Sequence, residues 1–78
     1  MFGYRLGMTA KDLIRVRRLA ATGAARAMRE DAGLSLSELA DAAQVHKVTV
    51  FRWEHGQRRP RGTAALRYLE VLDELSGR

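Results

Sequence analysis

The chain has 78 residues, 46% of them hydrophobic, no cysteine and a formal net charge of +5. This length allows one small domain, and the composition is globular rather than disordered. The lack of cysteine excludes a disulfide framework and a thiolate metal site. No apolar run reaches membrane-spanning length and no signal-peptide pattern opens the chain, so we expect a cytoplasmic protein without membrane contact. The basic balance favours a polyanionic partner, although an ordinary basic protein would carry the same charge.

Helical periodicity runs through the chain after the first residues, and no stretch alternates with period two. Thr9 followed by Asp12 predicts a helix start, because threonine is a good N-cap and an acid belongs among the first amides. Thr22-Gly23 either divides this helix from the next or lies inside one long helix. The next helical segment is expected at 24–32, with Gly33 at its C-cap.

Three more helices are expected in the second half of the chain. Ser35 and Glu38 form a capping-box pattern that opens a short helix. Another helix is expected at 47–55, ending at Gly56, and the last at about 63–75. The sequence therefore predicts an all-α fold.

The stretch GLSLSELADAAQVHKVTVFRWEHGQRRP, residues 33–60, is similar to the lambda-repressor/Cro-like (Xre) helix-turn-helix family. The features that coincide in register are Gly33-Leu34-Ser35, Glu38-Leu39-Ala40, Val45, Val50, Arg52-Trp53-Glu54, Gly56 and Arg59-Pro60. The resemblance covers about residues 24–72 and implies a compact bundle of about five helices. It implies that 36–43 is the first helix of the motif and that 47–55 is the recognition helix, which lies in the DNA major groove.

Under this reading, residues 1–8 form an N-terminal arm, 9–23 a helical extension and 24–78 the helix-turn-helix DNA-binding domain. Arg15, Arg17 and Arg18 form a basic cluster in the extension. Three roles stay open for this cluster: contact with the DNA backbone, contact with a second subunit, or simple solvation.

The recognition helix has two different faces, since successive residues turn by about 100°. Val50, Trp53 and Glu54 fall on the side expected to face the core. The predicted DNA base contacts fall on the other side and are Lys47, Val48, Phe51 and Arg52. Arginine and lysine bind guanine edges, and apolar groups meet the thymine methyl. Val48 and Phe51 could instead pack on the N-terminal segment or on a second subunit.

Two further sets of residues follow from the resemblance. A buried carboxylate needs a partner, and the resemblance implies that Glu54 pairs with Arg29 on the preceding helix. The residues expected to contact DNA phosphates are Ser35, Ser37, His46, Thr49, Arg58, Arg59 and Arg61. A solvated loop is the alternative for the arginines, and a plain surface residue is the alternative for His46.

The sequence departs from the family at the turn of the motif, where Gln44 stands at a position usually held by glycine. We expect Gln44 to adopt a left-handed conformation at a cost of about 1 kcal/mol. Leu36 also replaces a glutamine that binds phosphate in many relatives. The backbone amides at this helix start remain available for that contact.

We interpret the chain as a sequence-specific, double-stranded DNA-binding transcription regulator of the phage Cro-like or repressor type, associated with the nucleoid. No enzyme activity, cofactor or metal is expected, and His46 and His55 are too far apart for a metal pair on one helix. A homodimer built partly on the last helix is predicted from Tyr68, Val71 and a stripe of leucines. That stripe comprises Leu66, Leu69, Leu72 and Leu75. A monomer is the structural alternative, and an antitoxin or adaptor that binds mainly a protein partner is the functional one.

Overall fold

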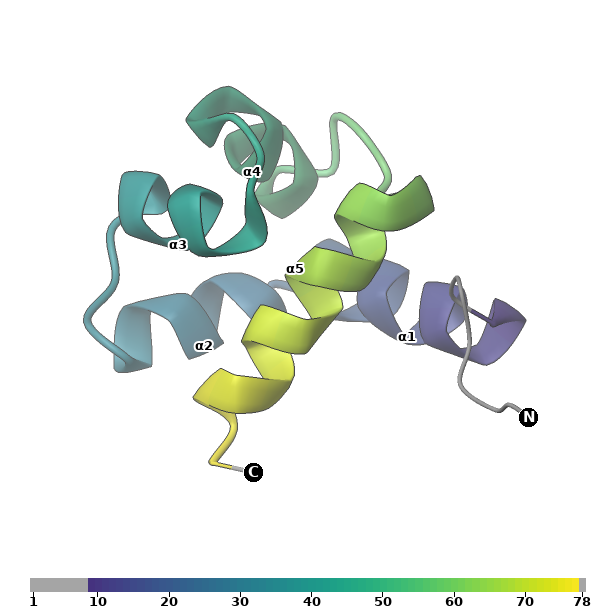
Figure 1. The fold of residues 1–78 in the computed structure, drawn as a ribbon, viewed down its shortest axis with the longest axis horizontal. Helices are drawn as coiled ribbons and strands as arrows, with labels where there is room; N and C mark the ends of the chain where they lie inside the picture. The colour runs from purple at the N-terminus through teal and green to yellow at the C-terminus, as the bar shows by residue number, and fades with distance from the viewer. Residues whose placement is uncertain (1–8, 78) are drawn as a thin grey trace.

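A computed structural model describes residues 9–77, and this part of the chain is built from helices joined by short turns (Figure 1). The helices are α1 (Ala10–Ala21), α2 (Ala24–Asp31), α3 (Leu36–Ala43), α4 (Lys47–Glu54) and α5 (Gly62–Leu75). In Figure 1, α3 and α4 lie together above α2, and α5 crosses in front of α1. The predicted all-α bundle of about five helices is confirmed. The predicted arm, residues 1–8, lies outside the described residues.

Two helices begin with capping boxes: one at Thr9, where the sequence indicated a helix start, and one at Ser35, where it indicated the capping box itself. Thr9 Oγ1 accepts a hydrogen bond from the Asp12 amide at 3.2 Å, and Asp12 accepts one from the Thr9 amide at 3.3 Å. Ser35 and Glu38 repeat this arrangement at 3.0 and 2.8 Å at the start of α3. Between α1 and α2 the chain breaks at Gly23, which has φ 88°. Thr22-Gly23 therefore separates two helices rather than interrupting one.

The turn between α3 and α4 is built on Gln44, which has φ 60° and ψ 44°. This is the left-handed conformation expected for a residue in place of the usual glycine. Arg67 of α5 supports the turn, because its Nε donates to the Ala43 carbonyl at 2.9 Å and its Nη2 to the Gln44 carbonyl at 3.3 Å. A cation is well placed at the end of a helix, where carbonyl groups lack intrahelical partners.

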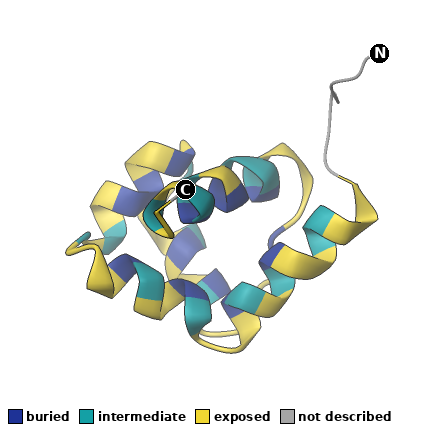
Figure 2. Ribbon diagram, turned by 90° about the horizontal axis from the view of Figure 1, so that it is seen from below, coloured by how far each residue is buried: buried dark blue, intermediate teal, exposed yellow. Residues whose placement is uncertain are grey.

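The core lies where the helices face one another, and Figure 2 shows buried residues along the inward side of the ribbon. Its buried hydrophobic residues are Val16, Ala20, Ala25, Leu39, Ala40, Ala43, Val50, Trp53, Ala65, Tyr68, Leu69 and Leu72. The Trp53 and Tyr68 rings pack against each other with centroids 4.6 Å apart. The core thus joins α4 to α5, and it includes Val16 and Ala20 of α1.

The core of one chain already uses much of the leucine stripe that was predicted for a dimer surface. Only Leu69 and Leu72 of that stripe belong to the buried core, whereas Leu66 is half-buried. The reason is geometric, since a spacing of three residues drifts by about 60° per step around a helix of 3.6 residues per turn. Tyr68, Leu69 and Leu72 are buried, so their predicted contribution to a dimer surface was wrong. Val71 packs partly against the core.

Candidate nucleic-acid interface

Helix α4 is fixed through one face and presents the other to solvent. Val50 and Trp53 are buried in the core. On the opposite face Val48 is 51% and Phe51 38% exposed, and Lys47 and Arg52 are exposed beside them. Large hydrophobic side chains in water next to cations are typical of a surface that meets another molecule.

Phe51 has an aromatic neighbour on its own helix. The His55 ring stacks on it with centroids 4.0 Å apart, and His55 Nδ1 lies 2.9 Å from the Phe51 carbonyl. This contact covers one side of the Phe51 ring and leaves the side chain partly exposed. His55 therefore belongs to the outer face of α4 together with Phe51.

Arg29 and Glu54 form a two-armed ion pair between α2 and the end of α4. Arg29 Nε donates to Glu54 Oε2 at 2.7 Å, and Nη2 donates to Oε1 at 3.1 Å. Arg29 Nη1 also donates to the Leu34 carbonyl at 2.9 Å. The Glu54 side chain is 1% exposed and that of Arg29 10%. The hydrogen bond to Glu54 raises the pKa of Arg29, and the two-armed contact holds α4 against α2.

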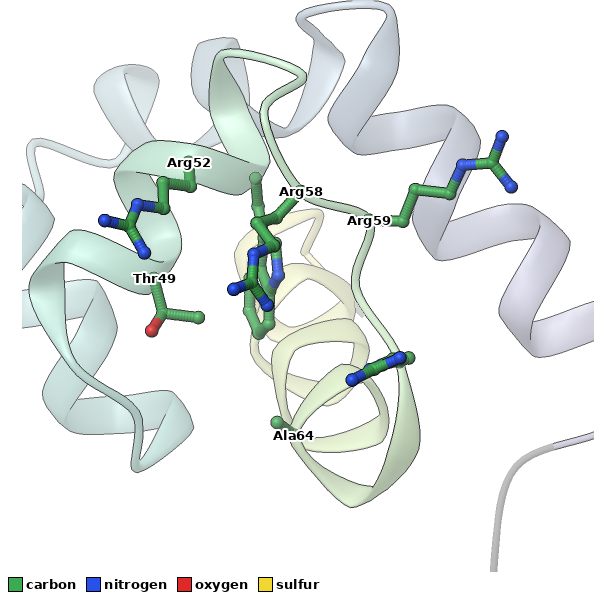
Figure 3. Close-up of a pocket in the computed structure, with 7 residues that line it drawn as sticks. Thr49, Arg52, Arg58, Arg59 and Ala64 are labelled. Carbon is green, nitrogen blue, oxygen red and sulfur yellow. The ribbon is translucent and has the colours of Figure 1, made fainter.

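A cleft of about 300 Å³ lies between α4 and the start of α5 (Figure 3). Its lining residues are Thr49, Arg52, Trp53, Arg58, Arg59, Arg61 and Ala64. In Figure 3 the Arg58 side chain points into the cleft, whereas Arg59 extends away from it toward α1. The lining holds four arginines and no acidic residue, and the Arg61 side chain makes no capping hydrogen bond at the start of α5. Such a positive hollow beside a helix N-terminus suits an anionic group.

The loop that carries these arginines is anchored from α1. Pro60 is fully buried, and its carbonyl accepts a hydrogen bond from Arg17 Nε at 2.9 Å. Arg15 is exposed and forms an ion pair with Asp73 of α5, and Arg18 is exposed without a hydrogen bond or ion pair of its side chain within residues 9–77. The three arginines of the predicted basic cluster therefore have three different surroundings, and two of them make contacts within the chain.

The predicted phosphate contacts fall into two groups. Thr49, Arg58, Arg59 and Arg61 come together in the cleft with Arg52. Ser35, Ser37 and His46 do not line it and lie instead at the starts of α3 and α4. The Ser35 hydroxyl accepts from the Glu38 amide, and the His46 side chain makes no capping hydrogen bond.

Within residues 9–77, no group of three His, Cys, Asp or Glu side chains is arranged as metal ligands. None of the helices described there is long and apolar enough to cross a membrane.

A short helix, a left-handed turn and a second helix with an exposed cationic face define a helix-turn-helix protein. The comparison with known families agrees, since residues 26–77 match a family model described as helix-turn-helix. The chain belongs to the lambda-repressor/Cro-like (Xre) helix-turn-helix family, which is a family of DNA-binding transcription regulators. No curated protein and no solved structure matches the chain.

Proposed function

We propose that the protein binds double-stranded DNA sequence-specifically, with α4 in the major groove, and regulates transcription as a Cro-like or repressor-type protein. The observation that carries the proposal is the two-sided environment of α4. Its inner face is held by the core and by the Arg29–Glu54 ion pair, while its outer face is free. A recognition helix needs this rigidity, because base contacts depend on a fixed position of the helix.

The outer face of α4 supplies groups that distinguish base pairs. Lys47 and Arg52 are the cations that would donate to the O6 and N7 atoms of guanine. Val48 and Phe51 are the apolar side chains that would meet thymine methyl groups. We propose these four residues as the sequence-reading set.

The arginine cleft would hold the sugar-phosphate backbone beside the groove. Arg58 and Arg61, with Thr49 on α4, would bind a phosphate there, and Arg59 would reach a neighbouring one on the side of α1. Ser35, Ser37 and His46 would contact phosphates at the starts of α3 and α4. Backbone contacts on both sides of the groove fix the register of α4 but carry no sequence information.

We further propose that the protein acts as a homodimer. Two recognition helices related by a two-fold axis would enter successive major grooves about 34 Å apart. Such an arrangement reads a site whose two halves are inverted repeats.

Selection of bound duplexes from a random pool tests the function. We expect recovered sites to share a motif of two inverted halves, bound about a thousandfold or more tighter than scrambled duplexes at the same salt concentration. Equal affinity for the recovered sites, for scrambled duplexes and for heparin would contradict the proposal. Recovery of a single half-site would support sequence-specific DNA binding but would contradict the proposed homodimer.

A protein-binding role, as in an antitoxin or adaptor, is favoured by one observation outside α4: Ile14 on α1 is 57% exposed. The Arg52→Ala variant separates the two functions. A role in DNA reading requires Arg52→Ala to weaken DNA binding, whereas a role as an adaptor leaves DNA affinity unchanged.

A further inference from the structure

The outer face of α1 carries a basic stripe made of Lys11, Ile14, Arg15 and Arg18. These residues are spaced three, one and three apart, so they lie on one side of the helix. With Leu19 they line a hollow of about 290 Å³. Exposed Ile14 lies among three cations, and an apolar side chain is not what a purely phosphate-binding surface requires.

The outer face of α5 carries an acidic stripe made of Glu70, Asp73 and Glu74. The spacing again places the three residues on one side of the helix, and Glu70 and Glu74 are exposed. Leu66 lies one turn before Glu70 and is half-buried. The acidic stripe therefore also combines charge with apolar surface.

The two stripes adjoin, because Arg15 and Asp73 form an ion pair across the boundary between α1 and α5. The remaining charges of the stripes are not neutralised in this way. No hydrogen bond or ion pair joins the side chains of Lys11, Arg18, Glu70 or Glu74 to another residue in the described part of the chain. The surface therefore carries unpaired positive charges next to unpaired negative charges.

We infer that a second copy of this chain binds to this surface through a two-fold axis near the Arg15–Asp73 pair. A two-fold rotation places the basic stripe of each copy on the acidic stripe of the other, so the surface is complementary to itself. It also removes Ile14 from water in both copies. An unrelated acidic partner would match only the basic stripe, whereas a second copy matches both. The inference names the surface of the homodimer in the proposed function, and it rests on that proposal.

Charge reversal on one stripe at a time tests the pairing, measured by sedimentation without DNA. The wild-type chain should sediment as a dimer. Lys11→Glu with Arg18→Glu, and separately Glu70→Lys with Glu74→Lys, should each raise the dimer dissociation constant by about a hundredfold or more, because like charges then face each other twice. An equimolar mixture of the two variants should form a heterodimer, since every facing pair is again of opposite sign.

A chain that carries all four substitutions should regain the homodimer for the same reason. Lys47→Glu with Arg52→Glu is the matched control for Lys11→Glu with Arg18→Glu, because it changes the same residue types on α4 and lowers the net charge by the same amount. This control should remain dimeric. Thermal melts by circular dichroism test whether each variant is folded. We expect folded variants, because all the substituted side chains are exposed.

Three results would overturn the inference: a monomeric wild-type chain, dimers that survive either single-stripe reversal, or a mixture that stays monomeric. Since the assay contains no DNA, its failure leaves the DNA-binding proposal intact. Conversely, loss of sequence preference in the duplex selection would not alter the sedimentation result. The DNA-binding proposal and the inference can therefore fail separately, whereas a monomeric wild-type chain would also contradict the proposed homodimer.

Discussion

Arg29 and Glu54 join the helix before the motif to the last residue of the recognition helix, through hydrogen bonds of 2.7 and 3.1 Å. Because the Glu54 side chain is almost fully buried, the carboxylate depends on this one guanidinium for its charge compensation. Arg29 in turn reaches the Leu34 carbonyl, so the same side chain also holds the segment that leads into α3.

Arg29→Ala should lower the free energy of unfolding by about 3–5 kcal/mol, since it leaves the Glu54 carboxylate buried without a partner. Urea denaturation followed by circular dichroism measures this. Arg26→Ala is the control, because Arg26 pairs with Glu30 on the exposed side of α2. A loss of about 0.5 kcal/mol or less is expected there. Equal losses in the two variants would contradict the structural role of the buried pair.

Tyr68→Phe should raise the free energy of unfolding by about 1 kcal/mol. The Tyr68 hydroxyl is buried and has no hydrogen-bond partner among the described residues, so its removal relieves an uncompensated desolvation. Phenylalanine keeps the ring contact with Trp53. A destabilised Tyr68→Phe variant in the same urea titration would show that the hydroxyl has a partner in solution.

Stability should fall as the pH rises above about 10, in part because of Tyr68. Burial raises the pKa of Tyr68 far above its ordinary value of 10.0 in the folded protein. Above pH 10 the unfolded chain releases the Tyr68 proton while the folded chain keeps it. A rising pH therefore favours unfolding by up to about 1.4 kcal/mol per pH unit. Unfolding free energies measured from pH 8 to 11 should decline less steeply for Tyr68→Phe. Parallel curves would contradict the prediction.

Gln44→Gly should stabilise the protein by about 0.5 kcal/mol. Glycine relieves a left-handed conformation that costs a side-chain-bearing residue about 1–2 kcal/mol, but it also adds flexibility to the unfolded chain. Gly56→Ala is the reverse change, since Gly56 has φ 71°, and it should destabilise by about 1 kcal/mol. Thermal unfolding midpoints that shift in the same direction for both variants would disagree with this account.

Arg52→Ala and Arg58→Ala should affect DNA binding in different ways. Arg52 lies on the outer face of α4, so its loss should cost about 1–3 kcal/mol on the selected site and relax specificity there. Arg58 points into the cleft, and its loss should weaken binding to all duplexes alike. The slope of log affinity against log salt concentration should fall by about one unit, because one phosphate contact is lost. Fluorescence anisotropy titrations at several salt concentrations distinguish the two patterns.

Local signals in the sequence were sufficient to predict much of the fold. The helix start at Thr9 and the Ser35–Glu38 capping box depend on residues three apart, so both could be predicted from spacing alone. The left-handed Gln44 followed from its position in a known motif. The family resemblance also singled out Arg29 and Glu54, two residues that no spacing rule would join across 25 positions.

Contacts between distant segments could not be predicted in this way. Arg67 binds carbonyl groups more than 20 residues away, and Arg17 reaches Pro60 across 43 positions. The sequence alone does not distinguish an arginine that binds a carbonyl group from one that binds a carboxylate or DNA. The dimer surface of α5 was misjudged because leucine spacing does not show which side chains the core takes, and the core takes Tyr68, Leu69 and Leu72 but not Leu66.

Helix α1 precedes the matched segment, yet Val16 and Ala20 are part of the same hydrophobic core as the motif. A fragment that begins at residue 26 would expose the core surface that Val16 and Ala20 cover, and it would lose the hydrogen bond from Arg17 to the arginine-bearing loop. Anyone transplanting this module into a chimeric protein should therefore carry the chain from Thr9 onward, and should leave the outer surface of α1 clear of the fusion joint.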